Sequence, residues 1–513
     1  MVVLLDTFCG TLTNGRHCLV YLKETMKITV TRVDGALKVD PAPDYITHYL
    51  QYSHRSFALR GWQRVNKFEK RELYSAAPDS GVITFAGFFD KITSLINDAG
   101  DEIIIDDRRT LVKEPDLPAV KNINWDGIGS VGLRDYQAPL VAEFLFAVRD
   151  GNGICCATGG VGKTIFMACT YAAFSHIGQT ILAVPLKAIF EQTYDKFCKL
   201  FPDKHIGRVG NGCCDISEDI TITSFKSLPK CPLEKCKLLL MDEIQGTTSD
   251  GIVKILSSVT PVRMLGFTAT DKNLFNQADK LVKGLFGERL IFVPYEDAQA
   301  NGAVVPCKVY MVKVPDMAVF DAGSIEGKIM RGIKRNEVRN RLIGEVCGAV
   351  PKDWQTLVFV DHIADHLIPL YKFMPQGTTF VHRGQDKEFG AFSLNPKKQD
   401  QNLEDFRSGK YQYLLATDCL RSGADVPQIK VVVQASGGTS EVEILQEAYR
   451  AARLAPDKTH AIIIDFQDNH DETLNNMAAK REAIYKKQGW IIKQVDSVKD
   501  IVWEWTEEKP REL

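Results

Sequence analysis

The residues from Gly153 to Thr164 read GICCATGGVGKT, and they decide the fold. A short apolar run leads into a glycine-rich loop, and a helical pattern follows the loop directly. Glycines in this arrangement allow backbone N–H groups to converge on phosphate oxygens at the positive end of the helix. The stretch therefore predicts a phosphate-binding loop between a strand and a helix.

Within this loop, two side chains carry the expected chemistry. We expect Lys163 to reach the β- and γ-phosphates of ATP and the Thr164 hydroxyl to ligate Mg²⁺. Ala157 stands where the strict form of the motif begins with glycine. The residues predicted to bind the nucleotide are Thr158, Gly159, Gly160, Val161, Gly162, Lys163 and Thr164.

Around the loop, short apolar runs alternate with helical patterns. The runs lie at 153–156, 180–184, 220–223, 238–241 and 264–267, and again at 308–312, 356–360, 379–381, 413–416, 430–433 and 461–464. Runs this apolar, separated by segments of helix length, indicate parallel sheets that are covered on both faces. We therefore predict an α/β fold with two tandem doubly wound domains, at residues 126–300 and 301–485.

The flanks of these two domains have a different pattern. Polar and apolar residues alternate at 26–33, which favours antiparallel strands, and a helical pattern begins near Gly87. Residues 1–125 are therefore predicted to form a small α+β domain in front of the two larger ones. Residues 486–513 are expected to be a C-terminal tail.

A second acidic motif ends the apolar run at 238–241. Asp242 and Glu243 follow this run, so they are expected at the carboxyl edge of a strand. There Asp242 could hold the Mg²⁺ ion, and Glu243 could orient and deprotonate a water that attacks the γ-phosphate. Together with the phosphate loop, these residues predict nucleotide hydrolysis.

Composition restricts the function further. The formal net charge is −2, from 63 basic and 65 acidic side chains, so nucleic-acid binding would depend on local basic patches. No apolar run approaches the ~18 residues that a membrane-spanning helix needs, so no membrane partner is predicted. The first residues do not have the pattern of a signal peptide, and the 13 cysteines are expected to be reduced thiols in a cytoplasmic protein.

Further motifs, in a fixed order, resemble those of superfamily 2 helicases. They begin with Leu133-Arg134-Asp135-Tyr136-Gln137 and continue through Thr268-Ala269-Thr270, residues 357–360, 416–418 and 423–427, and Gln446 to Arg453. The resemblance implies two RecA-like domains with ATP between them, recognition of the ATP base by Gln137, and coupling of hydrolysis to movement through Thr268, Ala269 and Thr270. It also implies nucleotide contacts from Arg134, Gly423, Asp425 and Gln446.

The last of these motifs supplies two arginines. Arg450 and Arg453 are three residues apart, so on a helix they share one face. The resemblance implies that both enter the ATP cleft from the second domain, where they would stabilise the charge of the transition state. ATP binding would then close the cleft, and ATP hydrolysis would let it open again.

The same resemblance places nucleic-acid contacts on loops away from ATP. The residues that it implies are Pro185, Gln192, Thr223 and Ser224 in the first domain, and His382, Arg383 and Thr417 in the second. Hydroxyls and backbone amides at such positions contact phosphates without reading bases, so binding should be largely independent of sequence.

The front domain has a basic and aromatic stretch between Tyr52 and Arg71 that includes Arg64 and Lys67. Such a mixture suits a duplex or a junction through phosphate contacts and stacking. The order of glycines and aromatics at 61–92 is similar to the front domain of bacteriophage branch-migration and recombination helicases. This similarity implies that forked or branched DNA is the substrate.

Two alternatives to a DNA helicase remain open at this stage. One is an RNA helicase, and the other is an ATP-gated nucleic-acid clamp that does not unwind. Gln245 stands where many superfamily 2 helicases have histidine or aspartate, so the coupling of hydrolysis to movement is also open. The sequence predicts no particular protein partner.

Overall fold

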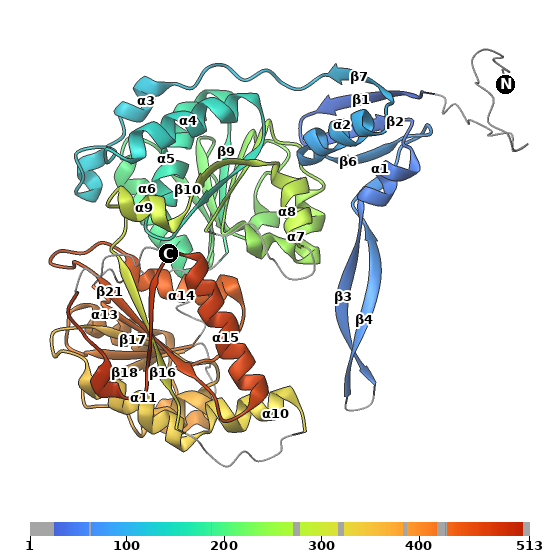
Figure 1. Ribbon diagram of the computed structural model, residues 1–513. Coiled ribbons are helices and arrows are strands. Elements are labelled where there is room, and N and C mark those ends of the chain that lie inside the picture. The colour runs from blue at the N-terminus through green and yellow to red at the C-terminus, as the bar shows by residue number, and fades with distance from the viewer. Residues whose placement is uncertain are drawn as a thin grey trace, which may run out of the picture.

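The computed structural model describes residues 25–60, 63–185, 187–269, 278–315, 323–382, 387–417, 426 and 428–505, without the side chains of 54–60, 63–68, 187, 188, 278, 387 and 388. Its strands form sheets of five, eight and seven strands and a separate two-stranded hairpin. Figure 1 shows two α/β domains stacked on one another, here called the first and the second motor domain. A smaller accessory domain lies beside the first motor domain.

The first motor domain has the eight-stranded sheet, in the order β11-β10-β12-β9-β13-β14-β8-β15. Its strands are β8 (Gly153–Ala157), β9 (Thr180–Val184), β10 (Ile206–Gly210), β11 (Cys213–Asp215), β12 (Ile220–Ser224), β13 (Leu238–Asp242), β14 (Arg263–Thr268) and β15 (Arg289–Val293). All paired strands are parallel except β10 and β11. Every residue of β8, β9 and β13 is buried, as predicted for a sheet covered on both faces.

Helices cover both faces of this sheet. They are α3 (Leu117–Lys121), α4 (Gln137–Asp150), α5 (Lys163–Phe174), α6 (Lys187–Leu200), α7 (Asp250–Leu256), α8 (Ala278–Phe286) and α9 (Tyr295–Ala300). Helix α3 packs on α5, and the Asn124 amide donates to the Leu200 carbonyl at 3.0 Å. The first motor domain therefore begins before residue 126, with the segment that contains α3.

The second motor domain has the seven-stranded sheet, in the order β18-β19-β17-β20-β21-β16-β22, with all pairs parallel. Its strands are β16 (Cys307–Lys313), β17 (Thr356–Phe359), β18 (Thr378–Val381), β19 (Tyr413–Ala416), β20 (Val431–Gln434), β21 (Ala461–Gln467) and β22 (Ile491–Val495). Its helices are α10 (Ile325–Ile329), α11 (Glu337–Ala349), α12 (Ile368–Tyr371), α13 (Pro396–Arg407), α14 (Glu441–Ala452) and α15 (Glu472–Lys487).

The segment that we expected to be a C-terminal tail belongs partly to this second sheet. Strand β22 pairs with β16, and the Tyr310 hydroxyl donates to the Val502 carbonyl at 2.9 Å. The apolar residues of β22 therefore complete the sheet at its edge. A pairing between segments this far apart in the chain has no local signature, which is why the sequence suggested a tail.

The accessory domain is the predicted α+β unit. Its sheet has the order β5-β6-β2-β1-β7, and a hairpin of β3 and β4 stands apart from it. The elements are β1 (Lys27–Val33), β2 (Ala36–Asp40), α1 (Asp44–Tyr49), β3 (Gln51–Arg60), β4 (Gln63–Glu72), β5 (Tyr74–Ala76), β6 (Val82–Phe85), α2 (Phe89–Asp98) and β7 (Glu102–Asp107). In Figure 1 the hairpin projects away from the sheet, alongside the second motor domain.

The accessory domain shares a hydrophobic core with the first motor domain. Phe88 packs on α8 at Gly284, where a Cβ would lie 2.5 Å from the Phe88 ring. One buried cluster joins the accessory sheet, α2 and α8. The accessory domain is therefore packed onto the first motor domain through a common apolar interface. Among the residues that the structure describes, no helix is both long and apolar enough to cross a lipid bilayer.

Candidate ATP site between the motor domains

The predicted catalytic groups of the first motor domain meet at one edge of its sheet. Strands β13, β14 and β8 are neighbours and parallel, so their carboxyl ends lie side by side. The phosphate loop follows β8, Asp242 ends β13 and is followed by Glu243, and Thr268 ends β14. Sheet topology thus brings together three motifs that are widely spaced in the chain.

The phosphate loop has the backbone that an anion site requires. Gly160 and Gly162 have φ angles of +100° and +103°, a region that side-chain-bearing residues rarely adopt. Gly162 is the N-cap of α5, and no side chain caps this helix. The N–H groups of its first turn therefore face the loop as donors.

Lys163 lies close to the acidic motif. Its Nζ atom is 3.7 Å from the Glu243 Oε1 atom and donates to the Ala157 carbonyl at 3.4 Å. Asp242 is buried beside this pair, and its Oδ1 atom accepts from the Glu243 amide at 3.0 Å. Burial, and then the Glu243 charge, raise the pKa of Asp242 to about 7, whereas Lys163 acts in the opposite direction.

This set of groups fits a nucleoside triphosphate with Mg²⁺. The loop supplies N–H donors and an ammonium group, which suit phosphate oxygens. Because Asp242 is buried, a neighbouring cation would stabilise its charged form. Carboxylates are ligands that Mg²⁺ prefers. Lys163 and the loop would hold the nucleotide, and Thr164 and Asp242 would hold the metal.

Gln245 connects the acidic motif to the end of β14. Its Nε2 atom donates to the Glu243 Oε2 atom at 2.8 Å, and its Oε1 atom accepts from the Thr268 hydroxyl at 2.8 Å. The side chains from Lys163 to Thr268 therefore form one chain of contacts. Sequence reasoning noticed Gln245 only as a departure from the helicase pattern and missed this bridge, because it depends on the spacing of β13 and β14.

We predict that Gln245→Ala separates hydrolysis from movement. The substitution removes both hydrogen bonds but leaves Glu243 and Lys163 in place. Strand displacement per ATP hydrolysed should fall roughly 5-fold or more, since a coupling contact contributes on the order of 1–2 kcal/mol. Parallel ATPase and displacement assays would measure this, with Gln299→Ala on the exposed surface of α9 as the control. An unchanged ratio of displacement to hydrolysis would contradict the bridge.

Gln137 lies against the phosphate loop. Its Nε2 atom donates to the Val161 carbonyl at 2.8 Å, and its Oε1 atom accepts from the Arg134 amide at 3.1 Å. Next to it is a hollow of about 450 Å³, lined by Asp135, Tyr136, Pro139, Leu140, Phe292, Val293, Asp297 and Asn301. In this structure the Gln137 amide supports the loop, and its contact with the ATP base stays a prediction.

The second motor domain contributes α14, which carries Gln446 and Arg450. Arg453 is the C-cap of this helix and has an extended backbone, so the expectation that the two arginines share one helical face is wrong. Arg450 is 5% exposed, and Gln446 is half-buried. Arg453 ends the helix and forms an isolated β-bridge with Val304. A Cβ on Gly160 would lie 3.9 Å from the Arg453 Cγ atom, so the structure brings Arg453 to the phosphate loop. The predicted Gly423, Asp425 and Thr270 lie outside the described residues, and Ala269 follows β14 directly.

The predicted nucleic-acid contacts of the first motor domain lie at neighbouring strand ends. Pro185 follows β9, and Thr223 and Ser224 end β12, which pairs with β9. The Thr223 hydroxyl is buried and donates to the Val209 carbonyl at 2.9 Å. Gln192 lies on α6. Pro185 and Ser224, which are partly exposed, are the better placed for a ligand.

In the second motor domain, His382 follows β18 and Thr417 follows β19, so the two lie at adjacent strand ends. Both are buried, and the His382 Nε2 atom is 2.7 Å from the Phe392 carbonyl oxygen. These side chains would have to become exposed to contact a phosphate. Arg383, and the side chains of Arg64 and Lys67, lie outside what the structure describes.

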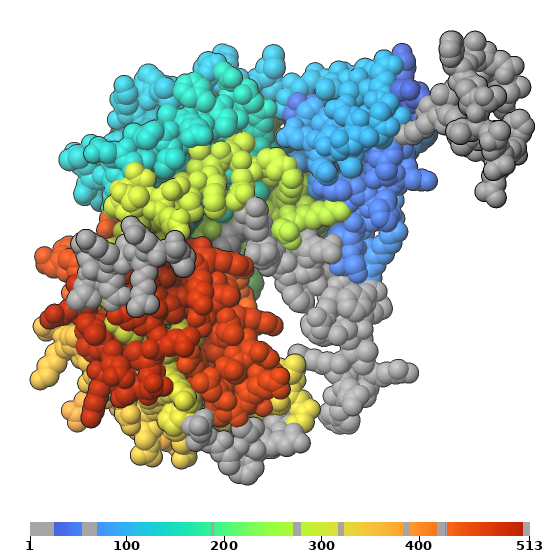
Figure 2. Space-filling view, in the orientation of Figure 1, coloured from blue at the N-terminus to red at the C-terminus, as the bar shows by residue number. Residues whose placement is uncertain are grey.

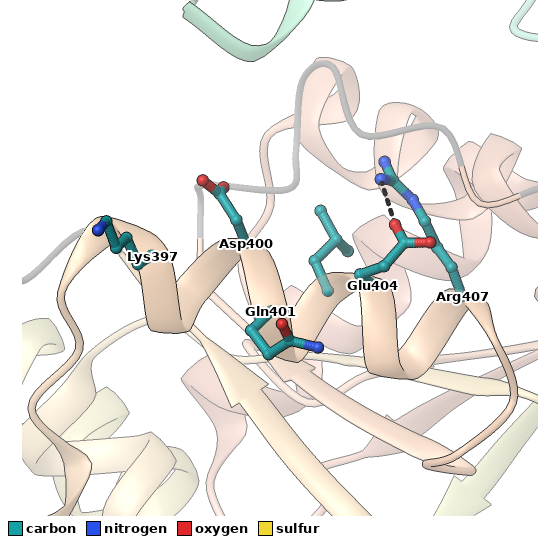
Figure 3. A pocket seen from close by; sticks show the side chains of 6 residues that line it. Lys397, Asp400, Gln401, Glu404 and Arg407 are labelled. Atoms are coloured by element: carbon teal, nitrogen blue, oxygen red, sulfur yellow. Dashed lines mark hydrogen bonds and ion pairs between the residues drawn. The ribbon is translucent and has the colours of Figure 1, made fainter.

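A second hollow, of about 440 Å³, lies on α13 and is shown in Figure 3. It is lined by Lys397, Asp400, Gln401, Leu403, Glu404 and Arg407. The Arg407 guanidinium is 3.4 Å from the Glu404 carboxylate. All six side chains belong to one helix, and none is a predicted ATP or nucleic-acid residue. We therefore assign this hollow no part in the predicted site.

Two known protein families match the two motor domains. Residues 130–273 match the family described as "Type III restriction enzyme, res subunit", and residues 338–455 match the "Helicase conserved C-terminal domain". The first match contains the phosphate loop and the Asp242–Glu243 motif, and the second contains α14. Together the two matches cover about half of the chain.

Three individual proteins show the same relationship. The chain is 25% identical to a putative mitochondrial ATP-dependent helicase, irc3, of Schizosaccharomyces pombe, over 66% of this chain and 57% of that protein. It is 27% identical to the putative helicase 22 of a Sulfolobus islandicus filamentous virus, over 70% of this chain and 68% of that protein. The structure of Saccharomyces cerevisiae Dbp5 bound to RNA and ADP BeF3 has the same fold, with a TM-score of 0.54 and 16% identity over 73% of this chain and 92% of that one.

Two RecA-like domains, with a phosphate loop and an acidic pair on one and an arginine-bearing helix on the other, are the arrangement found in ATP-dependent nucleic-acid motors. The two family matches identify the domains of a superfamily 2 helicase in this chain. The chain spans a little over half the length of the yeast relatives that it matches.

Proposed function

We propose that this protein is an ATP-driven DNA helicase or translocase that acts on forked or branched DNA. The observation that carries the proposal is the β3–β4 hairpin, which extends from the accessory domain alongside the second motor domain (Figure 1). Figure 2 shows the accessory domain packed against the first motor domain and apart from the second. A duplex arm that entered on the side of the hairpin would lie between it and the second motor domain.

The base of the hairpin is fixed to the first motor domain. The Arg71 guanidinium binds both carboxylate oxygens of Asp250 at the start of α7, with one contact of 3.1 Å. The Lys280 ammonium on α8 donates to the carbonyls of Tyr49 and Gln51. Because α7 and α8 follow the Glu243 and Thr268 motifs in the chain, the hairpin is anchored to elements next to the ATP site.

This anchoring gives the hairpin a mechanical role. When ATP closes and opens the seam, the second motor domain moves relative to the first, and the hairpin stays with the first. Nucleic acid held by the second motor domain would therefore move past the hairpin. A basic hairpin that stands still while a strand is drawn past it is suited to separating or guiding two strands.

In the hydrolysis step, Lys163 would bind the phosphates and Glu243 would orient and deprotonate the attacking water. The chemistry that Mg²⁺ supplies is neutralisation of charge on the phosphate oxygens. Arg453, at the end of α14, would approach the same phosphates from the second motor domain. The hydrogen bonds from Glu243 through Gln245 to Thr268 would couple changes at the ATP site to the rest of the first motor domain.

One experiment tests the substrate class. ATPase rates would be measured with single-stranded, duplex, forked and four-way DNA and with matched RNAs, at one stated salt concentration. The proposal expects the highest stimulation from forked or four-way DNA. Higher stimulation by RNA would favour an RNA helicase. Strong hydrolysis without strand displacement or branch migration would favour an ATP-gated clamp.

We predict that the double variant Arg64→Ala with Lys67→Ala, in the hairpin, weakens forked-DNA binding. Loss of two phosphate contacts should lower affinity roughly 10-fold and reduce the salt slope by about 2. ATPase stimulated by short single strands should change less than about 2-fold. The matched control, Lys397→Ala with Lys398→Ala, removes the same charge from the exposed side of α13. Equal loss for both double variants would mean that the hairpin has no special role.

Deleting all of residues 1–125 would not be a clean version of this test. The deletion would expose the apolar face of α8, which packs against Phe88, and would remove α3 from its place on α5. Loss of both contacts would destabilise the first motor domain itself. The hairpin substitutions leave this shared core intact.

A further inference from the structure

The phosphate loop is in direct contact with the second motor domain at Gly159. A Cβ atom on Gly159 would lie 2.9 Å from the Cβ atom of Tyr449, which is closer than such atoms approach in proteins. Gly159 is not among the glycines with positive φ, so its backbone would accept alanine without strain. The three atoms nearest to a side chain at this position all belong to Tyr449.

Tyr449 is itself held on three sides. Its ring is nearly parallel to that of Tyr295, with centroids 6.1 Å apart, and nearly perpendicular to that of Trp490, at 5.9 Å. Its hydroxyl donates to the Gln488 Oε1 atom at 2.6 Å. Tyr295 comes from the end of the first motor domain, whereas Gln488 and Trp490 precede β22. The Tyr449 ring therefore packs against residues of both motor domains.

The position of Tyr449 on α14 makes this contact relevant to catalysis. Arg450 is the next residue of the helix, and Arg453, the C-cap that follows Ala452, lies beside Gly160. The Val305 amide donates to the Ala452 carbonyl at 2.9 Å and holds the same helix end to the segment between α9 and β16. A displacement of Tyr449 away from Gly159 would move the arginine end of α14 with it, because the helix is rigid over one turn.

We propose that Tyr449 is a positioning residue, which seats α14 on Gly159 and so sets how closely the arginines approach the bound triphosphate. This inference rests on the proposed ATP-driven activity. The contact is available only because residue 159 has no side chain. Residues 488–490, which were expected to belong to the C-terminal tail, would hold the Tyr449 ring in place.

A double-mutant cycle tests this contact, using Gly159→Ala, Tyr449→Gly and the two changes combined. Gly159→Ala should push α14 away and lower the nucleic-acid-stimulated kcat at least about 10-fold, because arginines that stabilise a phosphoryl-transfer transition state contribute ~10³-fold or more. The Kd of a fluorescent ATP analogue should change less than about 3-fold. In the Tyr449→Gly background, the added alanine should change kcat less than about 2-fold, since the two residues would no longer touch.

Two outcomes would overturn the inference. If Gly159→Ala lowers kcat equally in both backgrounds, the alanine disturbs phosphate binding directly, and Tyr449 does not position α14. If Gly159→Ala leaves kcat unchanged, the contact has no effect on the reaction. Absence of nucleic-acid-stimulated ATPase in the unaltered protein would instead contradict the proposed function. Failure of the proposed function and failure of the Tyr449 inference can therefore be told apart.

Additional variants control for folding. Gly438→Ala adds a methyl group just before α14, where nothing lies within 4 Å, and should leave kcat unchanged. Tyr449→Phe removes the hydrogen bond to Gln488 but keeps the ring and the Cβ contact with Gly159, so it should lower kcat less than Gly159→Ala does. If Tyr449→Gly does not fold, small-angle scattering with an ATP analogue decides the question. Gly159→Ala should then be more open than the unaltered protein, and identical scattering would overturn the proposal.

Discussion

Replacing Lys163 by alanine should lower ATP hydrolysis at least about 100-fold. The ammonium group lies at the start of α5, 3.7 Å from the Glu243 Oε1 atom, where it would face the phosphates. Loss of one preorganised charge of this kind typically costs 10²- to 10³-fold in rate. Steady-state ATPase with saturating forked DNA would measure the effect.

The same variant should still bind DNA within about 3-fold of the unaltered protein, because Lys163 is not among the predicted nucleic-acid contacts. Lys254→Ala, on the exposed side of α7, removes an equal charge from the first motor domain and serves as the control. ATP hydrolysis within tenfold of normal for Lys163→Ala would mean that the glycine-rich loop is not the phosphate site.

Changing Glu243 to glutamine should separate ATP binding from hydrolysis. The substitution removes the base that would accept a proton from the attacking water, but leaves Lys163 and the loop unchanged. General-base catalysis contributes about 10²- to 10⁴-fold, so single-turnover hydrolysis should slow by at least about 100-fold. Titration with a fluorescent ATP analogue should give a Kd within about 3-fold of normal.

Glu218→Gln, an exposed carboxylate of the same domain, is the control for the loss of charge. Normal turnover by Glu243→Gln would show that another group deprotonates the water. Slow turnover together with lost binding would instead place Glu243 among the groups that hold the nucleotide.

The two sheets were predictable because their signal is local. Strands such as β9 and β13 are apolar at every position and are separated by helix-length segments, a pattern that few other folds produce. The order of motifs likewise predicted membership of superfamily 2, which the family matches confirm. The roles assigned to individual residues, such as Gln137 and His382, stay predictions.

The parts that sequence reasoning missed all depend on contacts between distant segments. Residues 491–495 have the composition of many surface segments and become a strand only because β16 offers an open edge. Gln245 was a departure from a pattern until β13 and β14 placed Glu243 on one side of it and Thr268 on the other. No spacing along the chain could have shown either arrangement.

The amino-acid sequence alone determined that this protein has two parallel-sheet domains, a phosphate loop, an acidic pair and a later pair of arginines, because hydrophobic period and glycine spacing are properties of short segments. Only the tertiary structure decided that the accessory domain shares its core with α8 and that Tyr449 rests on Gly159. Those features arise from packing between surfaces whose shapes exist only after the chain has folded.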